Sequence, residues 1–263
     1  MGSATTQAIA AGRAALAEAK GDTLDLGREL FAARDVIAET ATLKGALADA
    51  AASAEAKQAL VDRVFRASTA DTRAVLRASA GARWSSADDL LTGLEELGIR
   101  AVAASVGDGQ TVIEELAAFQ KAVSADPDLE YAVGSALVPG GQKAQVVEKL
   151  LGGKASAATT TILAALVRRA AGRRIGDLIK RASTLVAAQA DRAVATVQTA
   201  APLTAEQSAR IRAALSKAEG REVVLTELVD PSVIGGVRVV IGDRVIDGSV
   251  ATRLNDLRLA LAG

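Results

Sequence analysis

Residues 223–250 read VVLTELVDPSVIGGVRVVIGDRVIDGSV, and this stretch decides the fold of the C-terminal part of the chain. Segments 223–229, 237–241 and 245–246 are rich in β-branched residues, which favour strands. The turn formers Asp230-Pro231 and Gly242-Asp243 separate them. The stretch therefore predicts three strands, the last two of which form a hairpin.

The flanking residues extend this unit on both sides. Upstream, a strand at 195–199 ends before Pro202, and Thr204 with Gln207 forms a capping box that starts a helix ending at Gly220. Downstream, Asp247 and Gly248 form a turn, and Ser249 is the N-cap of a last helix. The apolar residues of that last helix recur at helical spacing, at Val250, Leu254, Leu257 and Leu261. The unit is thus a small α+β (βαββα) unit over residues 193–263.

The first 192 residues have a helical period throughout. Alanine, the best helix former, is the commonest residue of the 263, and only 2% are aromatic. The predicted fold class is therefore mainly α: a helical bundle followed by the α+β unit. Within the bundle, Thr111 and Glu114 indicate a capping box, Asp126 an N-cap before Pro127, and the pairs Gly140-Gly141 and Gly152-Gly153 indicate breaks.

The helical part contains an internal repeat. At an offset of 86 residues, Glu29-Leu30 aligns with Glu115-Leu116, and 60–65 aligns with 146–151; further on the offset becomes 88. We interpret this as a duplication. The predicted domains are a first helical module at 1–106, which shares its last helix (about 90–106) with a second helical module at 107–192, and the C-terminal unit at 193–263.

Composition excludes several kinds of chemistry. The chain has no His and no Cys, so imidazole acid–base catalysis, thiol nucleophiles and zinc–cysteine sites are ruled out. Its formal net charge is 0, which does not favour nucleic acid as a partner. The longest uncharged stretch, 155–167, is too short to span a bilayer, and the N-terminus does not resemble a secretory signal. We expect a cytosolic protein without cofactor, metal or catalytic residues.

Four local patterns have simpler structural explanations. Residues 151–156 lack the first glycine of a phosphate loop, so we expect an interhelical turn. The acids of 126–130 lack the glycine of a calcium loop, so we expect a helix start. Trp84 is expected to anchor the core. A basic cluster is expected to be a solvated face or a protein contact; its members are Arg168, Arg169, Arg173, Arg174, Lys180 and Arg181.

The C-terminal signature resembles a known family. The runs 229–236 (VDPSVIGG) and 241–250 (IGDRVIDGSV), followed by Arg253-Leu254, are similar to the delta subunit of F-type ATP synthase, the family of the mitochondrial oligomycin-sensitivity-conferring protein. The duplicated helical module resembles the long form found in high-GC Gram-positive bacteria. The signature residues Gly235, Gly236, Asp247, Gly248 and Ser249 fit turns and a helix cap, which are structural roles.

The resemblance implies a non-catalytic stator subunit on the cytoplasmic face of the membrane. Its bundle would hold the N-terminal tails of the α subunits, and its C-terminal unit would hold the membrane-anchored b subunit. The family's tail groove lies between the first and fifth helices of the bundle, here about 90–106 and 156–171. Its candidate anchors are Leu94, Leu97, Val102, Ile162, Leu163, Leu166 and Val167. The same residues could instead face the bundle's own core, and a helical adaptor or a small-molecule enzyme remain alternative functions.

Overall fold

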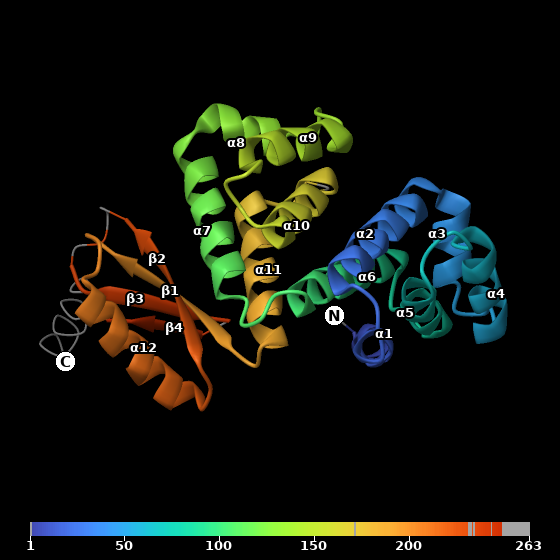
Figure 1. Ribbon diagram of the computed structural model, residues 1–263, viewed down its shortest axis with the longest axis horizontal. Helices are drawn as coiled ribbons and strands as arrows, with labels where there is room; N and C mark the ends of the chain where they lie inside the picture. The colour runs from blue at the N-terminus through green and yellow to red at the C-terminus, as the bar shows by residue number, and fades with distance from the viewer. Residues whose placement is uncertain (1, 171, 231–232, 234, 243, 249–263) are drawn as a thin grey trace, which may run out of the picture.

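The computed structural model describes residues 2–170, 172–230, 233, 235–242 and 244–248. The chain begins with a bundle of six helices, seen on the right of Figure 1. They are α1 (Ser3–Ala17), α2 (Thr23–Glu39), α3 (Ala41–Ala48), α4 (Ala54–Val64), α5 (Ala70–Gly81) and α6 (Ala87–Ala104). Five further helices follow in the middle of the molecule. They are α7 (Gln110–Ala125), α8 (Pro127–Gly134), α9 (Gly140–Leu151), α10 (Ala157–Arg168) and α11 (Ile175–Gln189).

The order of helix lengths repeats. Helices α2 to α6 match α7 to α11 one by one, and α1 matches α6, so α6 is both the last helix of the first module and the first helix of the second. The buried residues show the same double role. Leu90, Leu94 and Leu97 of α6 belong to the core of the first module. Ile99 and Val102 of the same helix belong to the core of the second.

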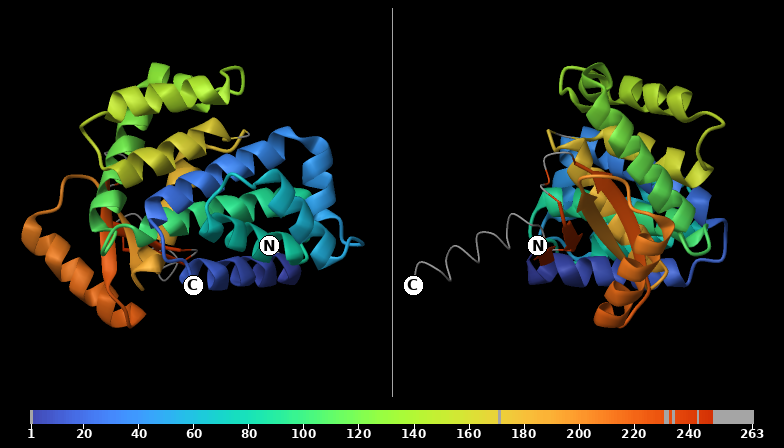
Figure 2. Two further views of the ribbon diagram at one scale, coloured as in Figure 1. Left: turned by 45° about the vertical axis from the view of Figure 1, so that its right-hand side comes forward. Right: turned by 90° about the vertical axis from the view of Figure 1, so that its left-hand side faces the viewer.

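The C-terminal unit is a mixed sheet with a helix on one face (Figure 2). Its elements are β1 (Ala193–Thr199), α12 (Ala205–Glu219), β2 (Val223–Val229), β3 (Val237–Ile241) and β4 (Arg244–Asp247). The strand order is β2-β1-β3-β4, with β1 parallel to β2 and antiparallel to β3. Strand β1 alternates buried and partly exposed residues, and its buried face packs on Leu215 of α12.

The helix boundaries that the sequence predicted lie in the second module and the C-terminal unit, and two of them differ from the structure. Asp126, Ser156 and the Thr204–Gln207 capping box begin helices as expected. The capping box at Thr111 is wrong, because the N-cap of α7 is Gly109, two residues earlier, with φ +70°. The pair Gly140-Gly141 starts α9 and does not break it. Gly140 is required there, because a Cβ would lie 2.1 Å from the Arg168 carbonyl oxygen. Ser249, Val250, Leu254, Leu257 and Leu261 lie outside the described residues.

Candidate functional site

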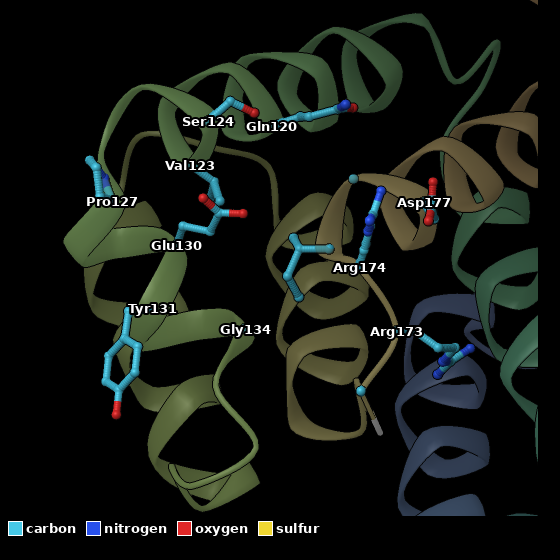
Figure 3. A pocket seen from close by; sticks show the side chains of 13 residues that line it. Gln120, Val123, Ser124, Pro127, Glu130, Tyr131, Gly134, Arg173, Arg174 and Asp177 are labelled. Atoms are coloured by element: carbon cyan, nitrogen blue, oxygen red, sulfur yellow. The ribbon is translucent and has the colours of Figure 1, made fainter.

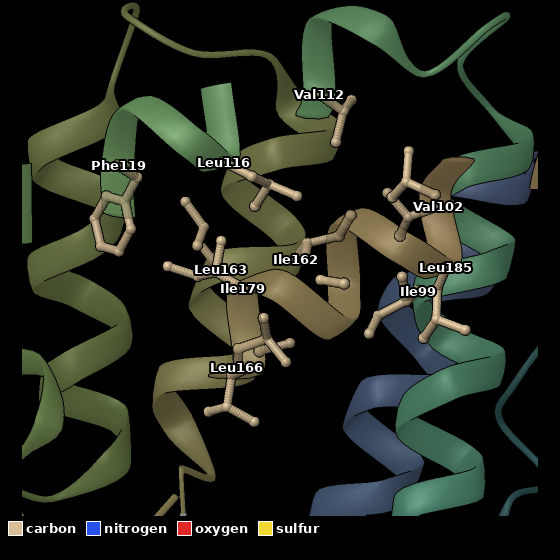
Figure 4. Packing of buried hydrophobic residues seen from close by; sticks show 14 of the residues in the cluster. Ile99, Val102, Val112, Leu116, Phe119, Ile162, Leu163, Leu166, Ile179 and Leu185 are labelled. Atoms are coloured by element: carbon tan, nitrogen blue, oxygen red, sulfur yellow. The ribbon is translucent and has the colours of Figure 1, made fainter. Parts of the chain in front are cut away.

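All seven candidate groove residues are buried. The core of the first module contains Leu94 and Leu97. The core of the second module contains Val102, Ile162, Leu163, Leu166 and Val167, and Figure 4 shows the first four of these. None is more than 2% exposed. Every residue of α6 from Gly93 to Ala103 is buried. A tail helix could therefore reach these side chains only by displacing a neighbour, and tail binding at these residues stays a prediction.

The neighbour that covers this seam is α2 of the first module. A Cβ on Gly98 of α6 would lie 2.6 Å from the Phe31 ring of α2, so the two helices cross closely. Arg34 of α2 donates through Nη2 to the carbonyl oxygen of Ala165 in α10, at 3.0 Å. Helix α2, which belongs to the first module, thus contacts both helices of the expected groove.

A buried carboxylate joins the two modules at this seam. Glu95 of α6 accepts from Arg34 Nη1 at 3.1 Å. It also accepts from both terminal nitrogens of Arg173, each at 2.9 Å. The Glu95 side chain is 3% exposed and that of Arg34 is 2% exposed. The positive charges of two guanidinium groups, one from each module, therefore compensate the hydration that this buried carboxylate has lost.

A second set of ion pairs lies beside the first. Glu96 accepts from Arg100 at 2.9 Å and from Arg181 of α11 at 3.1 Å. Asp35 of α2 pairs with Arg34 at 2.7 Å and faces Arg168 of α10 at 3.8 Å. Three members of the predicted basic cluster, Arg168, Arg173 and Arg181, thus contact acids of this chain.

Glu95 and Glu96 are not among the functional residues predicted from the sequence. A signal for them exists, since both acids stand between Leu94 and Leu97 in a mostly apolar helix. Charged residues at buried positions need partners. The sequence could therefore have identified the need for cations, but not which arginines meet it.

A cavity of about 600 Å³ opens in the second module (Figure 3). The end of α7, helix α8 and the start of α11 line it. Its apolar wall includes Val123, Pro127 and Tyr131, and its rim carries both acids and bases. Among the described residues no cluster of three acidic side chains could hold a metal ion.

The motif-like segments have structural roles, as predicted. Helix α9 ends at Leu151, Gly152 follows as its C-cap, Gly153 has φ +71°, and Ser156 begins α10. Residues 151–156 are therefore an interhelical turn. Asp126 accepts from the backbone N–H groups of Asp128 and Leu129, which makes it an N-cap. Trp84 is 4% exposed and donates to the Ser79 carbonyl oxygen at 2.8 Å.

The C-terminal unit combines turns that require glycine with exposed apolar residues. Gly235 and Gly236 have φ +71° and +82°, conformations that L side chains rarely adopt. The Gly248 N–H donates to the Val237 carbonyl oxygen at 2.9 Å. Leu228, Val229, Val245 and Ile246, on the two outer strands, are 37–48% exposed. Across the described chain, no helix is long and apolar enough to cross a membrane.

The chain is similar to proteins of known family over its whole length. Residues 99–261 match the profile of the family "ATP synthase delta (OSCP) subunit". ATP synthase subunit delta of Leifsonia xyli subsp. xyli is 46% identical over 265 residues, covering 100% of both chains. That of Rhodococcus opacus is 36% identical over 274 residues, covering 99% of both. A chain of the Toxoplasma gondii mitochondrial ATP synthase hexamer is 27% identical with a TM-score of 0.39, covering 64% of this chain and 96% of that chain.

Proposed function

Because the chain belongs to the ATP synthase delta (OSCP) family, and is thus a non-catalytic subunit of the peripheral stalk, we propose that it connects the α-subunit tails to the b subunit. The observation that carries this proposal is the 46% identity over the full length of a delta subunit. The helical modules hold the tails, and the C-terminal unit holds b at the cytoplasmic face of the membrane.

The test is purification of the tagged full chain from bacterial membranes, with mass spectrometry of what it retains. We expect the α and b subunits together with the rest of the ATP synthase. Membranes depleted of the chain should lose ATP-driven proton pumping and regain it when the full chain is added back. Retention of other proteins without α or b would contradict the proposal.

For the α tail, we propose the exposed faces of α1 and α5. These are the first and fifth helices of the first module, the same pair that the family uses in its bundle. Support comes from the duplication: the equivalent pair, α6 and α10, is covered by α2, and the backbone of Ala165 is already bonded to Arg34. Helices α5 and α10 align at an offset of 87, because their N-caps are Thr69 and Ser156. The equivalent of Ala165 is then Ala78, which is partly exposed, and Ala74, one turn earlier, is exposed. Small side chains here allow a helix to approach closely.

Titration of a synthetic α-tail peptide into the full chain tests this site. Ala74→Tyr places a bulky group on the exposed face of α5 and should weaken binding. Ala157→Tyr, at the exposed start of α10, is the matched control and should leave affinity unchanged. Weakening by Ala157→Tyr alone would return the site to the seam of α6 and α10.

For the b subunit, we propose the outer strands and the last helix of the C-terminal unit. The four exposed apolar residues of β2 and β4 support this assignment, because such residues gather where partners bind. Leu257→Ala in the predicted last helix should weaken capture of b and lower the melting temperature of the unit. Unchanged capture and melting would show that this helix neither packs on the unit nor binds b.

A further inference from the structure

The seam between the modules contains a group of ion pairs that the stalk function by itself does not require. We propose that Glu95 is the positioning residue of an ion-pair clamp that fixes the angle between the two helical modules about the shared helix α6. This inference rests on the proposed function only for its purpose, which is to keep the stator stiff under torque. The clamp itself is a property of the isolated chain.

The geometry supports this role because Glu95 contacts both modules at once. Its Oε2 accepts from Arg34 of α2 at 3.1 Å, and its two oxygens accept a bidentate pair from Arg173, which precedes α11. Bidentate arginine–carboxylate pairs fix orientation as well as distance. Apolar packing along α6 is non-directional, so it leaves the angle between the modules less well determined.

Arg34 extends the clamp to a third helix. Its guanidinium donates to Asp35 Oδ1 through Nε at 3.0 Å and through Nη2 at 2.7 Å, and Nη2 also reaches the Ala165 carbonyl oxygen of α10. The group lies 5.5 Å from the centre of the Phe31 ring. The contacts with Asp35 and Phe31 lie within α2 and hold the guanidinium in place, while those with Glu95 and the Ala165 carbonyl oxygen orient α2 against α6 and α10.

Glu96 repeats the arrangement on the adjacent position of α6. It holds Arg100 of the same helix and Arg181 of α11, at 2.9 and 3.1 Å. Its contacts fix α11 against α6 but do not reach α2. The clamp between modules therefore depends on Glu95, and Glu96 supports only one side of it.

The polar seam has no counterpart at the equivalent position of the first module. At the offset of 86, the counterpart of Glu95 is Ile9 of α1, which is 7% exposed. A Cβ on Gly93 would lie 2.3 Å from the Trp84 ring and 3.4 Å from Ile9, so an apolar contact occupies this place in the first module. Of these two equivalent positions, only the one on α6, the helix shared by both modules, has a carboxylate.

Pulsed electron–electron spectroscopy on the full chain tests the clamp. The chain has no Cys, so Arg63→Cys and Lys149→Cys can carry one spin label each. These two positions are exposed, are equivalent at the offset of 86 and lie on α4 and α9, one in each module. We expect a single narrow distance distribution in the parent. Glu95→Gln should broaden it or add a second peak.

Two further variants keep the test decisive. Arg173→Gln removes the second-module partner, whose side chain is 36% exposed, so it is less disruptive to folding; it should also broaden the distribution. Glu29→Gln is the matched control, since its carboxylate accepts hydrogen bonds from Thr69 and Thr72, both in the first module, and the distance should not change. Circular dichroism establishes that each variant is folded. Unchanged distributions in folded Glu95→Gln and Arg173→Gln would overturn the clamp.

A separate measurement distinguishes failure of the clamp from failure of the stalk function. In reconstituted membranes, Glu95→Gln should still assemble but give less proton pumping for each ATP hydrolysed. If the parent itself does not restore pumping, the stalk function fails while the distance measurement still stands. If pumping is normal although the distances broaden, the clamp exists but is not needed for coupling, which overturns its stated purpose.

Discussion

Glu29 and Glu115 occupy equivalent positions in the two helical modules and accept equivalent hydrogen bonds. Glu115 accepts from the Ser156 N–H at 2.9 Å and from the Ser156 hydroxyl at 2.7 Å, and Thr159 also donates to it. Glu29 accepts from the Thr69 N–H at 3.0 Å and its hydroxyl at 2.8 Å. Each carboxylate ties the N-terminus of the fifth helix of its module to the second helix. The duplication is therefore preserved in individual hydrogen bonds.

These bonds make stability depend on pH. Burial raises the pKa of Glu115, but hydrogen bonds from Ser156 and Thr159 outweigh it, so the pKa lies below the ordinary 4.5. The unfolded chain then binds a proton at a higher pH than the folded chain does. The stabilisation is complete above the unfolded pKa and is lost as pH falls through the lower folded value.

Glu115→Gln tests this linkage. Glutamine puts an N–H₂ group where the site has donors, so we expect a loss of about 1–3 kcal/mol near neutral pH. The melting temperature of the parent should fall more steeply than that of the variant as pH drops below about 4.5. Glu148→Gln, on the exposed side of α9, is the control. Parallel pH profiles for parent and Glu115→Gln would contradict the assignment.

Among the elements, the crossing of α2 and α6 depends on two glycines. A Cβ on Gly27 would lie 2.4 Å from Val102 Cγ2 and 3.0 Å from the Gly98 carbonyl oxygen. A Cβ on Gly98 would enter the Phe31 ring. The two backbones thus approach where neither helix has a side chain. This crossing also brings Arg34 within reach of Glu95 and Ala165.

Gly27→Ala should therefore destabilise the chain although alanine favours helices. Overpacking costs about 1–3 kcal/mol, which exceeds the gain of about 1 kcal/mol in helix propensity. Gly45→Ala in α3 is the matched control, because a Cβ there meets no atom within 4 Å. It should stabilise by about 0.5–1 kcal/mol. Urea unfolding of the full chain measures both, and stabilisation by Gly27→Ala would contradict the close crossing.

The sequence could predict elements better than their junctions. Periodicity and caps are local, so the helices, the strands and the repeat follow from the residues themselves. The N-cap predicted at Thr111 was wrong because Gly109, with its positive φ, is the N-cap of this helix. The covering of the α6–α10 seam by α2 could not be predicted, because Arg34 and Ala165 are 131 residues apart. Apolar spacing does not distinguish a groove from a core, and the seven residues that it selected are buried in the cores of the two modules.

At the scale of the whole molecule, the C-terminal unit is tied to the second module at a short junction. Only residues 190–192 separate α11 from β1. Arg192 pairs with Asp108 at 3.1 Å and with Glu222 at 2.8 Å, so one side chain joins the module to the unit. Val224 of β2 adds an apolar contact, because it belongs to the core of the second module.

The prediction of separable domains can therefore be tested through Arg192. We expect limited proteolysis to cut near 190–194 and release a helical fragment and a β-containing fragment.

Arg192→Ala removes both ion pairs, and local opening of the junction should become more frequent. Thermolysin is the suitable protease, because it cleaves before apolar residues and does not need the arginine. Cleavage should be faster in Arg192→Ala than in the parent or in Arg221→Ala, a nearby exposed control. Equal rates in all three would mean that Val224 and its neighbours hold the unit without help from Arg192. A chain that resists cleavage at this junction in every variant would contradict separable domains.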